Sequence, residues 1–167
     1  MKYSQFNEEE IIEEIFNKIG TTNKYFVEIG CLENGRFSNT YLLKEKGWIG
    51  HWFDCNESPA VIKEMFTKNN INEILNRYNV PIDLDFMSID VDGDDYWLFK
   101  TMIFRPRVLC IEYNSNMEDG IAEEGKIWTG GKVFGSSEKE FLALARQKGY
   151  NLYTKNSSNL FFICQNQ

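Results

Sequence analysis

An open, mostly parallel α/β sheet with helices on both faces is the fold that this sequence predicts. The 167 residues, of which 43% are apolar and 15% aromatic, suffice for the core of one domain, expected to span residues 1–167. Short apolar runs typical of buried strands alternate with helical segments as far as Tyr113. Two final apolar runs joined by a polar turn predict a C-terminal antiparallel hairpin. Together these features are typical of a Rossmann-like fold.

The first helix is predicted between Asn7 and Gly20. Asparagine is a favoured N-cap, and glycine is a common C-terminal stop. Apolar residues recur at spacings of three and four along one face, namely Ile11, Ile12, Ile15, Phe16 and Ile19. Similar patterns predict further helices at residues 38–46, from 58 to about 68, and at 70–79, 96–102 and 137–147. The helix from residue 58 depends on the cap-then-proline pattern of Ser58 and Pro59.

Strands are predicted between these helices, at residues 24–30, 48–54, 84–90, 107–113, 151–154 and 160–164. Residues 114–135 are polar and glycine-rich, which predicts a long irregular loop of the kind that often covers a functional site. In open α/β sheets, ligands bind beyond the carboxyl ends of the strands. The sequence therefore predicts one site formed by residues 30–35, 54–56, 90–95 and 112–114.

The turn after the first strand carries glycines at positions 30 and 35, where the backbone can bend sharply and approach a ligand. Their spacing does not fit the dinucleotide-binding pattern of G-x-G-x-x-G. A phosphate-binding P-loop would need Lys and Ser or Thr after the second glycine, but Arg36 and Phe37 stand there. On spacing alone, a strand-to-helix turn without a ligand remains an alternative.

Asp54 ends the second predicted strand, about 20 residues after the glycine turn. An acidic residue at this place typically accepts hydrogen bonds from the ribose hydroxyls of a bound nucleoside. The alternative is a solvated aspartate at a strand end. If Asp54 does bind the ribose, its loss is expected to weaken binding by roughly 10- to 100-fold.

Four carboxylates, those of Asp90, Asp92, Asp94 and Asp95, follow the third predicted strand within six residues. They could hold a divalent cation, orient a cofactor's amino group or supply a general base. The EF-hand pattern fails, because its sixth position is Asp95 instead of glycine and its twelfth is Thr101. No metal is therefore predicted.

Alternating side-chain directions favour Asp90 and Asp92 as site residues. Asp94 and Asp95 can simply begin the next helix, where the macrodipole favours acidic side chains. From the following strand, the rim of the site is predicted to include Glu112, Tyr113 and Asn114, with solvated loop residues as the alternative.

Several classes of function are disfavoured by composition. The four cysteines are widely spaced and the only histidine is His51, so a Cys/His metal site is not expected and the thiols are expected to be reduced. The net charge of −7 opposes binding to nucleic acid or to anionic lipid. Because no apolar run approaches the 18 residues of a membrane span, a cytoplasmic protein is expected.

Taken in order, the motifs resemble the FkbM-like branch of class I S-adenosylmethionine-dependent methyltransferases, over nearly the whole chain. The first half contributes Tyr3-Ser-Gln5 with Glu8-Glu9, Val27-Glu-Ile-Gly30 with Ser38-Asn-Thr-Tyr41, and Gly47-Trp-Ile-Gly50. The second half contributes Met87-Ser-Ile-Asp-Val-Asp-Gly-Asp-Asp-Tyr-Trp97, Pro106-Arg-Val-Leu-Cys-Ile-Glu-Tyr-Asn114, Phe134-Gly-Ser-Ser137, Lys148-Gly-Tyr150 and Asn159-Leu-Phe-Phe162.

The resemblance implies a class I methyltransferase that binds S-adenosylmethionine. It implies that the residues around Gly30 hold the methionine part, that Asp54 holds the ribose, and that the Asp90 turn faces the transferred methyl. The predicted cofactor-binding residues are Glu28, Gly30, Cys31, Leu32, Gly35, Asn39, Asp54, Cys55, Asn56 and Asp90. The candidates for the catalytic base are Asp90, Asp92 and Glu112.

The expected reaction is O-methylation of a small-molecule or carbohydrate hydroxyl. Two departures from the family pattern favour an alternative, a catalytically degenerate fold that binds a nucleoside or a protein partner. Asn34 stands where relatives have glycine, and the stretch between Asp54 and Asn70 looks too short for the third strand of the fold. Methylation of RNA ribose is a further alternative, which the net charge of −7 disfavours.

Overall fold

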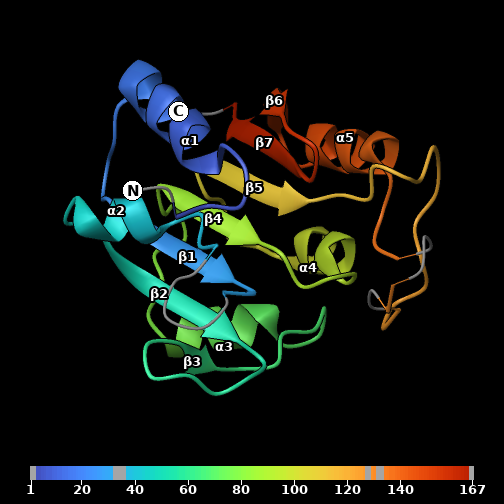
Figure 1. Ribbon diagram of the computed structural model, residues 1–167, viewed down its shortest axis with the longest axis horizontal. Coiled ribbons are helices and arrows are strands. Elements are labelled where there is room, and N and C mark those ends of the chain that lie inside the picture. The colour runs from blue at the N-terminus through green and yellow to red at the C-terminus, as the bar shows by residue number, and fades with distance from the viewer. Residues whose placement is uncertain (1–2, 32–36, 127–128, 131–133, 166–167) are drawn as a thin grey trace.

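The computed structural model describes residues 3–31, 37–126, 129–130 and 134–165. Within them the chain forms a seven-stranded sheet in the order β3-β2-β1-β4-β5-β7-β6 (Figure 1). The parallel part consists of β1 (Tyr25–Ile29), β2 (Ile49–Asp54), β3 (Ile62–Lys63), β4 (Phe86–Ile89) and β5 (Val108–Glu112). An antiparallel hairpin, β6 (Tyr150–Lys155) and β7 (Asn159–Cys164), joins the sheet beside β5. The predicted open, mostly parallel sheet with a C-terminal hairpin is confirmed.

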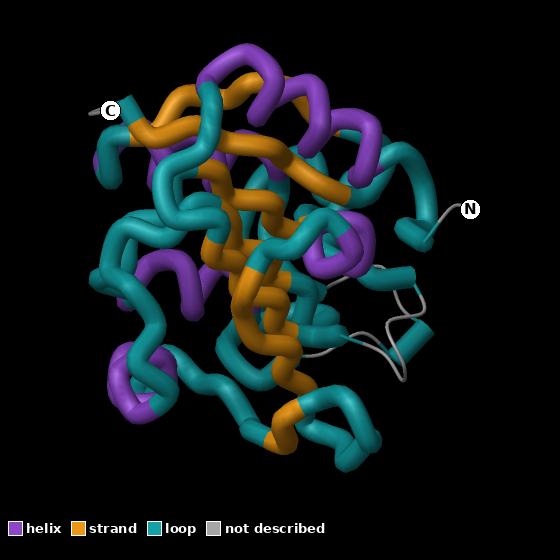
Figure 2. The backbone as a smooth tube through the Cα atoms, turned by 90° about the vertical axis from the view of Figure 1, so that its left-hand side faces the viewer, coloured by secondary structure: helices purple, strands orange, loops and turns teal. Residues whose placement is uncertain are grey.

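Helices cover both faces of this sheet (Figure 2). On one face lie α1 (Glu8–Ile19) and α2 (Tyr41–Glu45). On the other lie α3 (Ile71–Arg77), α4 (Asp95–Thr101) and α5 (Glu138–Gln147). Side chains of a strand alternate between faces, so Phe26 of β1 joins the core under α1 and α2, whereas Val27 and Ile29 join the core under the other helices. Because alternate side chains of each strand face opposite sides, the sheet has an apolar core on each face.

The helix predicted from residue 58 to about 68 is wrong. Ser58 pairs with Val61 in an isolated antiparallel bridge, and the chain then forms β3, whose Ile62 lies beside Phe53 of β2. Val61 packs into the core on the α1 and α2 face, whereas Phe66 packs into the core on the opposite face. One face of a helix cannot reach both cores, so this segment wraps around the edge of the sheet as an extended strand.

The expectation that the third strand is missing is also wrong. β3 is present at the edge of the sheet, although it has only two residues. It is short enough to fit between Asp54 and α3 because no helix precedes it: residues 55–61 form only turns and a bridge. The sheet therefore has its outermost parallel strand, β3, next to β2.

The helix predicted at 38–46 spans only Tyr41–Glu45, because residues 38–40 hydrogen-bond to the Glu28 carboxylate instead. The other expectations about local structure hold in the described residues. The polar turn at 156–159 joins β6 to β7, and the Asn156 Oδ1 atom accepts hydrogen bonds from the backbone N–H groups of Ser158 and Asn159 at 3.0 and 2.8 Å. The described part of residues 114–135 contains no helix and only one bridge, between Ile121 and Ser136. Among the helices of the described chain, none has the length and apolar character needed to cross a bilayer.

Candidate functional site

The carboxyl ends of the central strands meet at one edge of the sheet, as predicted. The backbone N–H of Gly30, after β1, donates to the Phe53 carbonyl of β2 at 2.8 Å. The backbone N–H of Asp90, after β4, donates to the Ile29 carbonyl of β1 at 2.9 Å. Glu112 ends β5, which pairs with β4. Residues far apart in the sequence are thus brought to a common edge.

Gly30 is required at this edge by the packing of the neighbouring strand. Its φ is +90°, and a Cβ atom at this position would lie 1.6 Å from the Asp90 carbonyl oxygen. Only glycine fits, because a side chain would clash with backbone that cannot move away. Two other predicted cofactor residues of this turn, Leu32 and Gly35, lie outside the described residues, as does Asn34.

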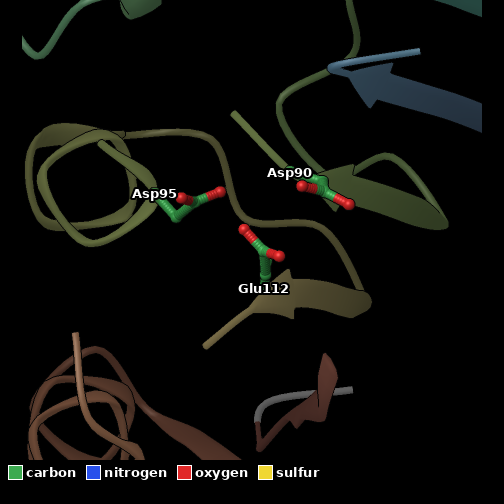
Figure 3. Close-up of side chains that lie close together, drawn as sticks. All are labelled: Asp90, Asp95 and Glu112. Atoms are coloured by element: carbon green, nitrogen blue, oxygen red, sulfur yellow. The ribbon is translucent and has the colours of Figure 1, made fainter. Parts of the chain in front are cut away.

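Three carboxyl groups converge next to Gly30. Each of Asp90, Asp95 and Glu112 offers an oxygen atom, and these atoms lie within 4.8 Å of one another (Figure 3). They come from the end of β4, the start of α4 and the end of β5, and they point toward a common centre (Figure 3). Such a set of oxygen atoms can hold a cationic group, either a metal ion or an organic ammonium or sulfonium.

Asp95 is the member of this cluster that sequence reasoning missed, and Asp92 lies outside it. β4 ends at Ile89, and the backbone then turns through Asp92 with a φ of +56°. The alternation of side-chain directions that predicts Asp92 as a site residue therefore stops before it. The Asp92 side chain is exposed, and its catalytic role stays a prediction. The useful signal would have been a carboxylate in the first turn of the following helix, two residues after a glycine.

Asp95 also shapes the turn that carries Asp90. It is only 2% exposed, and its two carboxylate oxygens accept hydrogen bonds from the backbone N–H groups of Val91 and Gly93, both at 2.9 Å. The turn therefore folds around the side chain at the start of α4. Because this side chain is fixed on both oxygens, it holds the turn and the cluster in one arrangement.

Burial raises the pKa of each carboxyl in this cluster. The neighbouring carboxyls raise the pKa values of Asp90 and Glu112 further. For Asp95, hydrogen bonds from Val91 and Gly93 work against burial without cancelling it. The buried Glu112 Oε2 atom has no hydrogen-bond donor among the described residues. The raised pKa values keep these carboxyls largely protonated at neutral pH unless a cationic partner binds beside them.

The residues at the end of β2 lie at the surface of the same edge. Asp54 is partly exposed, and its Oδ1 atom accepts a hydrogen bond from the Asn56 backbone N–H at 2.7 Å. Cys55 and Asn56 are exposed. The charge of the Asp54 carboxylate also contributes to the raised pKa of Asp92, after the partial desolvation of that side chain. A nucleoside at this edge can therefore reach Asp54 from solvent.

Three predicted cofactor residues are buried below this edge. Glu28 is 3% exposed, Asn39 is 6% exposed and Cys31 is 2% exposed. The Glu28 carboxylate and the Asn39 amide are hydrogen-bonded inside the protein. Burial, followed by the charge of Glu28, raises the pKa of the Cys31 thiol well above its ordinary value. Direct contacts of these side chains with a cofactor remain predictions.

The irregular segment after β5 is fastened beside the acidic turn. The Asp94 Oδ1 atom accepts a hydrogen bond from the Gly125 N–H at 2.7 Å, and the Trp97 Nε1–H donates to the Ala122 carbonyl at 3.2 Å. Asn114 is 2% exposed and donates through Nδ2 to the Phe134 carbonyl at 3.0 Å. This segment therefore lies against α4 and the turn that precedes it.

A separate cleft of about 560 Å³ lies between α5 and the segment that follows β5. It is lined by Tyr113, Ser115, Met117, Glu118, Glu138, Lys139, Leu142, Ala143, Arg146 and Lys155. Of the predicted site residues, only Tyr113 of the rim contributes to it. The acidic cluster and this cleft are thus distinct features of the molecule.

Comparisons with known proteins show the fold. No family model and no curated protein matches the sequence. Among solved structures, the chain is similar to a crystal structure assigned as a ribosomal RNA methyltransferase from Plasmodium falciparum, with 14% sequence identity and a TM-score of 0.52. The alignment covers 97% of each chain. Since likeness at this identity shows architecture alone, the conclusion is that this chain has a methyltransferase-like fold.

Proposed function

We propose that this protein is an FkbM-like methyltransferase, which binds S-adenosylmethionine at the carboxyl edge of its sheet and methylates a hydroxyl of a small molecule or carbohydrate. The observation that carries the proposal is the convergence of Asp90, Asp95 and Glu112 at this edge of a methyltransferase-like sheet. S-adenosylmethionine is a cation at its sulfonium and at its ammonium group. A buried acidic cluster is complementary to such a ligand.

The residues present fit the cofactor. The Glu112 Oε2 atom is buried and has no hydrogen-bond donor among the described residues, and a cationic ligand would supply the missing partner. The charges that raise the pKa values of Asp90 and Glu112 come from other carboxyls. A bound cation would lower these pKa values and stabilise the ionised forms.

Each group at the edge has a proposed role. The Asp54 carboxylate accepts hydrogen bonds from the ribose hydroxyls, and the backbone at Gly30 and Cys31 lies beside the methionine part. When bound, S-adenosylmethionine supplies a methyl group that its sulfonium activates for attack by a nucleophile. The carboxylate of Asp90 or Glu112, kept ionised by the bound cation, takes the proton of the acceptor hydroxyl. Most of the rate would come from positioning of the reactants.

Calorimetric titration with S-adenosylmethionine and S-adenosylhomocysteine tests this proposal. We expect binding of both, with tighter binding of the sulfonium cation. Asp54→Ala should weaken binding roughly 10- to 100-fold, since it removes a charged hydrogen-bond acceptor. Asp83→Ala is the matched control, because Asp83 is exposed and lies before β4, at the opposite edge of the sheet. Absence of binding at millimolar cofactor would contradict the proposal.

A small or carbohydrate acceptor is favoured over RNA by the net charge of −7. We expect no retention on a polyanion column at physiological salt, and retention would revive RNA as the acceptor. The alternative of a binding protein without catalysis is favoured by one observation, the two-residue length of β3 at the edge beside Asp54. Cofactor binding without turnover of a labelled methyl group on any hydroxyl compound would support that alternative.

A further inference from the structure

Glu28 is the penultimate residue of β1 and is almost completely buried, with 3% of its surface exposed. Its carboxylate accepts four hydrogen bonds from the short segment of residues 38–40. The hydroxyls of Ser38 and Thr40 donate at 2.6 and 2.5 Å, and the backbone N–H groups of Asn39 and Thr40 donate at 2.8 and 3.3 Å. Every donor in this set is itself buried.

The same segment is bound to two other strands. The Asn39 Nδ2 atom donates to the Ser88 Oγ atom of β4 at 3.0 Å, and the Trp52 Nε1–H of β2 donates to the Thr40 Oγ1 atom at 2.7 Å. Residues 38–40 are therefore attached to β1, β2 and β4 through buried polar groups. Glu28 is the centre of this network, because it accepts from every residue of the segment.

This network fixes one end of the connection that follows β1. The other end is fixed by the backbone N–H groups of Gly30 and Cys31, which donate to the Phe53 carbonyl at 2.8 and 3.1 Å. The proposed contacts with the methionine part of the cofactor belong to this connection. Glu28 thus anchors residues 38–40, where the connection that begins at Gly30 and Cys31 returns to the sheet.

Holding a segment in place with a buried carboxylate costs free energy, because the carboxylate is removed from water. Burial raises the pKa of Glu28, and the hydrogen bonds from Ser38 and Thr40 oppose that rise. Replacing buried polar groups with apolar side chains of similar volume is often neutral or stabilising. What a carboxylate provides instead is a defined geometry, because it fixes four donors at once.

We propose that Glu28 is a positioning residue for the cofactor, acting through its hydrogen bonds to residues 38–40 rather than by contact with the ligand. This inference rests on the proposed function. The sequence predicts Glu28 as a direct cofactor contact, whereas this proposal gives it an indirect role. It predicts that weakening the network lowers cofactor affinity by more than the accompanying loss of stability explains.

A matched control lies at the amino ends of the parallel strands, opposite the proposed site. Asp85 is fully buried and precedes β4, and its carboxylate accepts from the Thr22 hydroxyl at 2.7 Å, the Lys24 N–H at 2.8 Å and Arg107 Nη1 at 2.8 Å. Like Glu28, it is a buried carboxylate that joins a loop to the sheet. Unlike Glu28, it lies away from the proposed site.

The test compares Glu28→Gln and the milder Ser38→Ala with Asp85→Asn and Thr22→Val. For each variant, the melting temperature, the dissociation constant for S-adenosylmethionine and the hydrogen exchange of the Asn39 and Thr40 amides are measured. We expect about tenfold weaker binding for Ser38→Ala, or more for Glu28→Gln, with faster exchange of both amides. The two controls should lose melting temperature and keep the affinity of the unaltered chain.

The outcomes separate the two proposals. If the unaltered chain binds and Ser38→Ala binds within about twofold of it, the positioning role is wrong and the proposed function stands. The same conclusion follows if the controls lose as much affinity as the Glu28 network variants. If the unaltered chain does not bind the cofactor, the proposed function is wrong, and the positioning role is wrong with it.

Discussion

At the scale of single residues, one backbone atom explains the glycine at position 30. The Asp90 carbonyl oxygen lies where a Cβ atom would be, and φ is +90°. We expect Gly30→Ala to destabilise the fold by more than about 3 kcal/mol, because the clash involves backbone on both sides. Urea unfolding measures this loss.

Gly47→Ala provides the comparison for that substitution. Gly47 also has a positive φ, +81°, but a Cβ atom added there would meet nothing within 4 Å beyond its own chain neighbours. Its replacement should cost only the strain of a left-handed alanine, about 1–2 kcal/mol. Equal losses for the two variants would show that φ alone, and not the approach of Asp90, explains Gly30.

The carboxyl cluster makes a second prediction about residues, on pH. Burial and the charges of Asp90, Asp95 and Asp92 raise the pKa of Glu112. The folded state therefore binds more protons than the unfolded chain once pH exceeds about 4.3, and stability falls as pH rises toward the folded pKa. Glu112→Gln removes this ionisable group. We expect it to be more stable than the unaltered chain by about 1 kcal/mol at slightly alkaline pH, and not at about pH 4.

Urea unfolding at a series of pH values gives the difference directly. Glu57→Gln is the control, because Glu57 is an exposed glutamate outside the cluster. Its stability difference from the unaltered chain should not depend on pH. A Glu112→Gln variant whose stability follows the same pH profile as the unaltered chain would contradict the raised pKa.

At the scale of elements, α5 begins with a serine that does not cap it. Ser137 is in the N-cap position, yet its buried Oγ atom has no hydrogen-bond partner in the described structure. Replacing an N-cap serine with alanine typically costs about 1 kcal/mol. Here we expect Ser137→Ala to change the free energy of unfolding by less than about 0.5 kcal/mol, because no bond is lost and a buried hydroxyl is removed.

Ser38→Ala is the contrasting variant in chemical denaturation. Ser38 is equally buried, but its hydroxyl donates to Glu28 at 2.6 Å. Hydrogen bonds to charged groups contribute about 1.5–3 kcal/mol, so this variant should be clearly destabilised. A loss at Ser137 as large as that at Ser38 would indicate a cap hydrogen bond that the structure lacks.

At the scale of the whole molecule, Asp85 and Arg107 join α1 to the sheet. Arg107 Nη1 donates to Asp85 Oδ1 at 2.8 Å and to the Gly20 carbonyl at 3.0 Å. Burial alone would raise the pKa of Asp85, but hydrogen bonds from Arg107, Thr22 and Lys24 outweigh it and hold the pKa below its ordinary value. The stabilisation is therefore present above about pH 3.9 and is lost as pH falls through the folded pKa.

Asp85→Asn breaks this buried ion pair. We expect a loss of about 3 kcal/mol in the free energy of unfolding at neutral pH, since Arg107 is left without its carboxylate partner. The difference from the unaltered chain should shrink as pH falls below about 3.9 toward the lowered folded pKa of Asp85. A loss that stays constant with pH would mean that the charge of Asp85 contributes nothing to stability.

Apart from the segment between Asp54 and α3, the order of strands and helices, the parallel core and the C-terminal hairpin could be predicted from the sequence. Local patterns suffice for these features, because β1, β4 and β5 are short and mainly apolar segments and Gly20 ends α1. The sequence also predicted that Gly30, Asp54, Asp90 and Glu112 meet at one edge. That prediction needs only the rule that parallel strands end on the same side of a sheet.

The conformation of the segment after Asp54 and the membership of the acidic cluster depend on tertiary packing. The pattern of Ser58 and Pro59 is compatible with a helix, but Val61 and Phe66 pack on opposite faces of the sheet, so the chain forms β3. Asp95 replaced Asp92 in the cluster because the backbone reverses at Asp92, where strand alternation no longer applies. Both outcomes depend on contacts between segments distant in the chain, which no local spacing can encode.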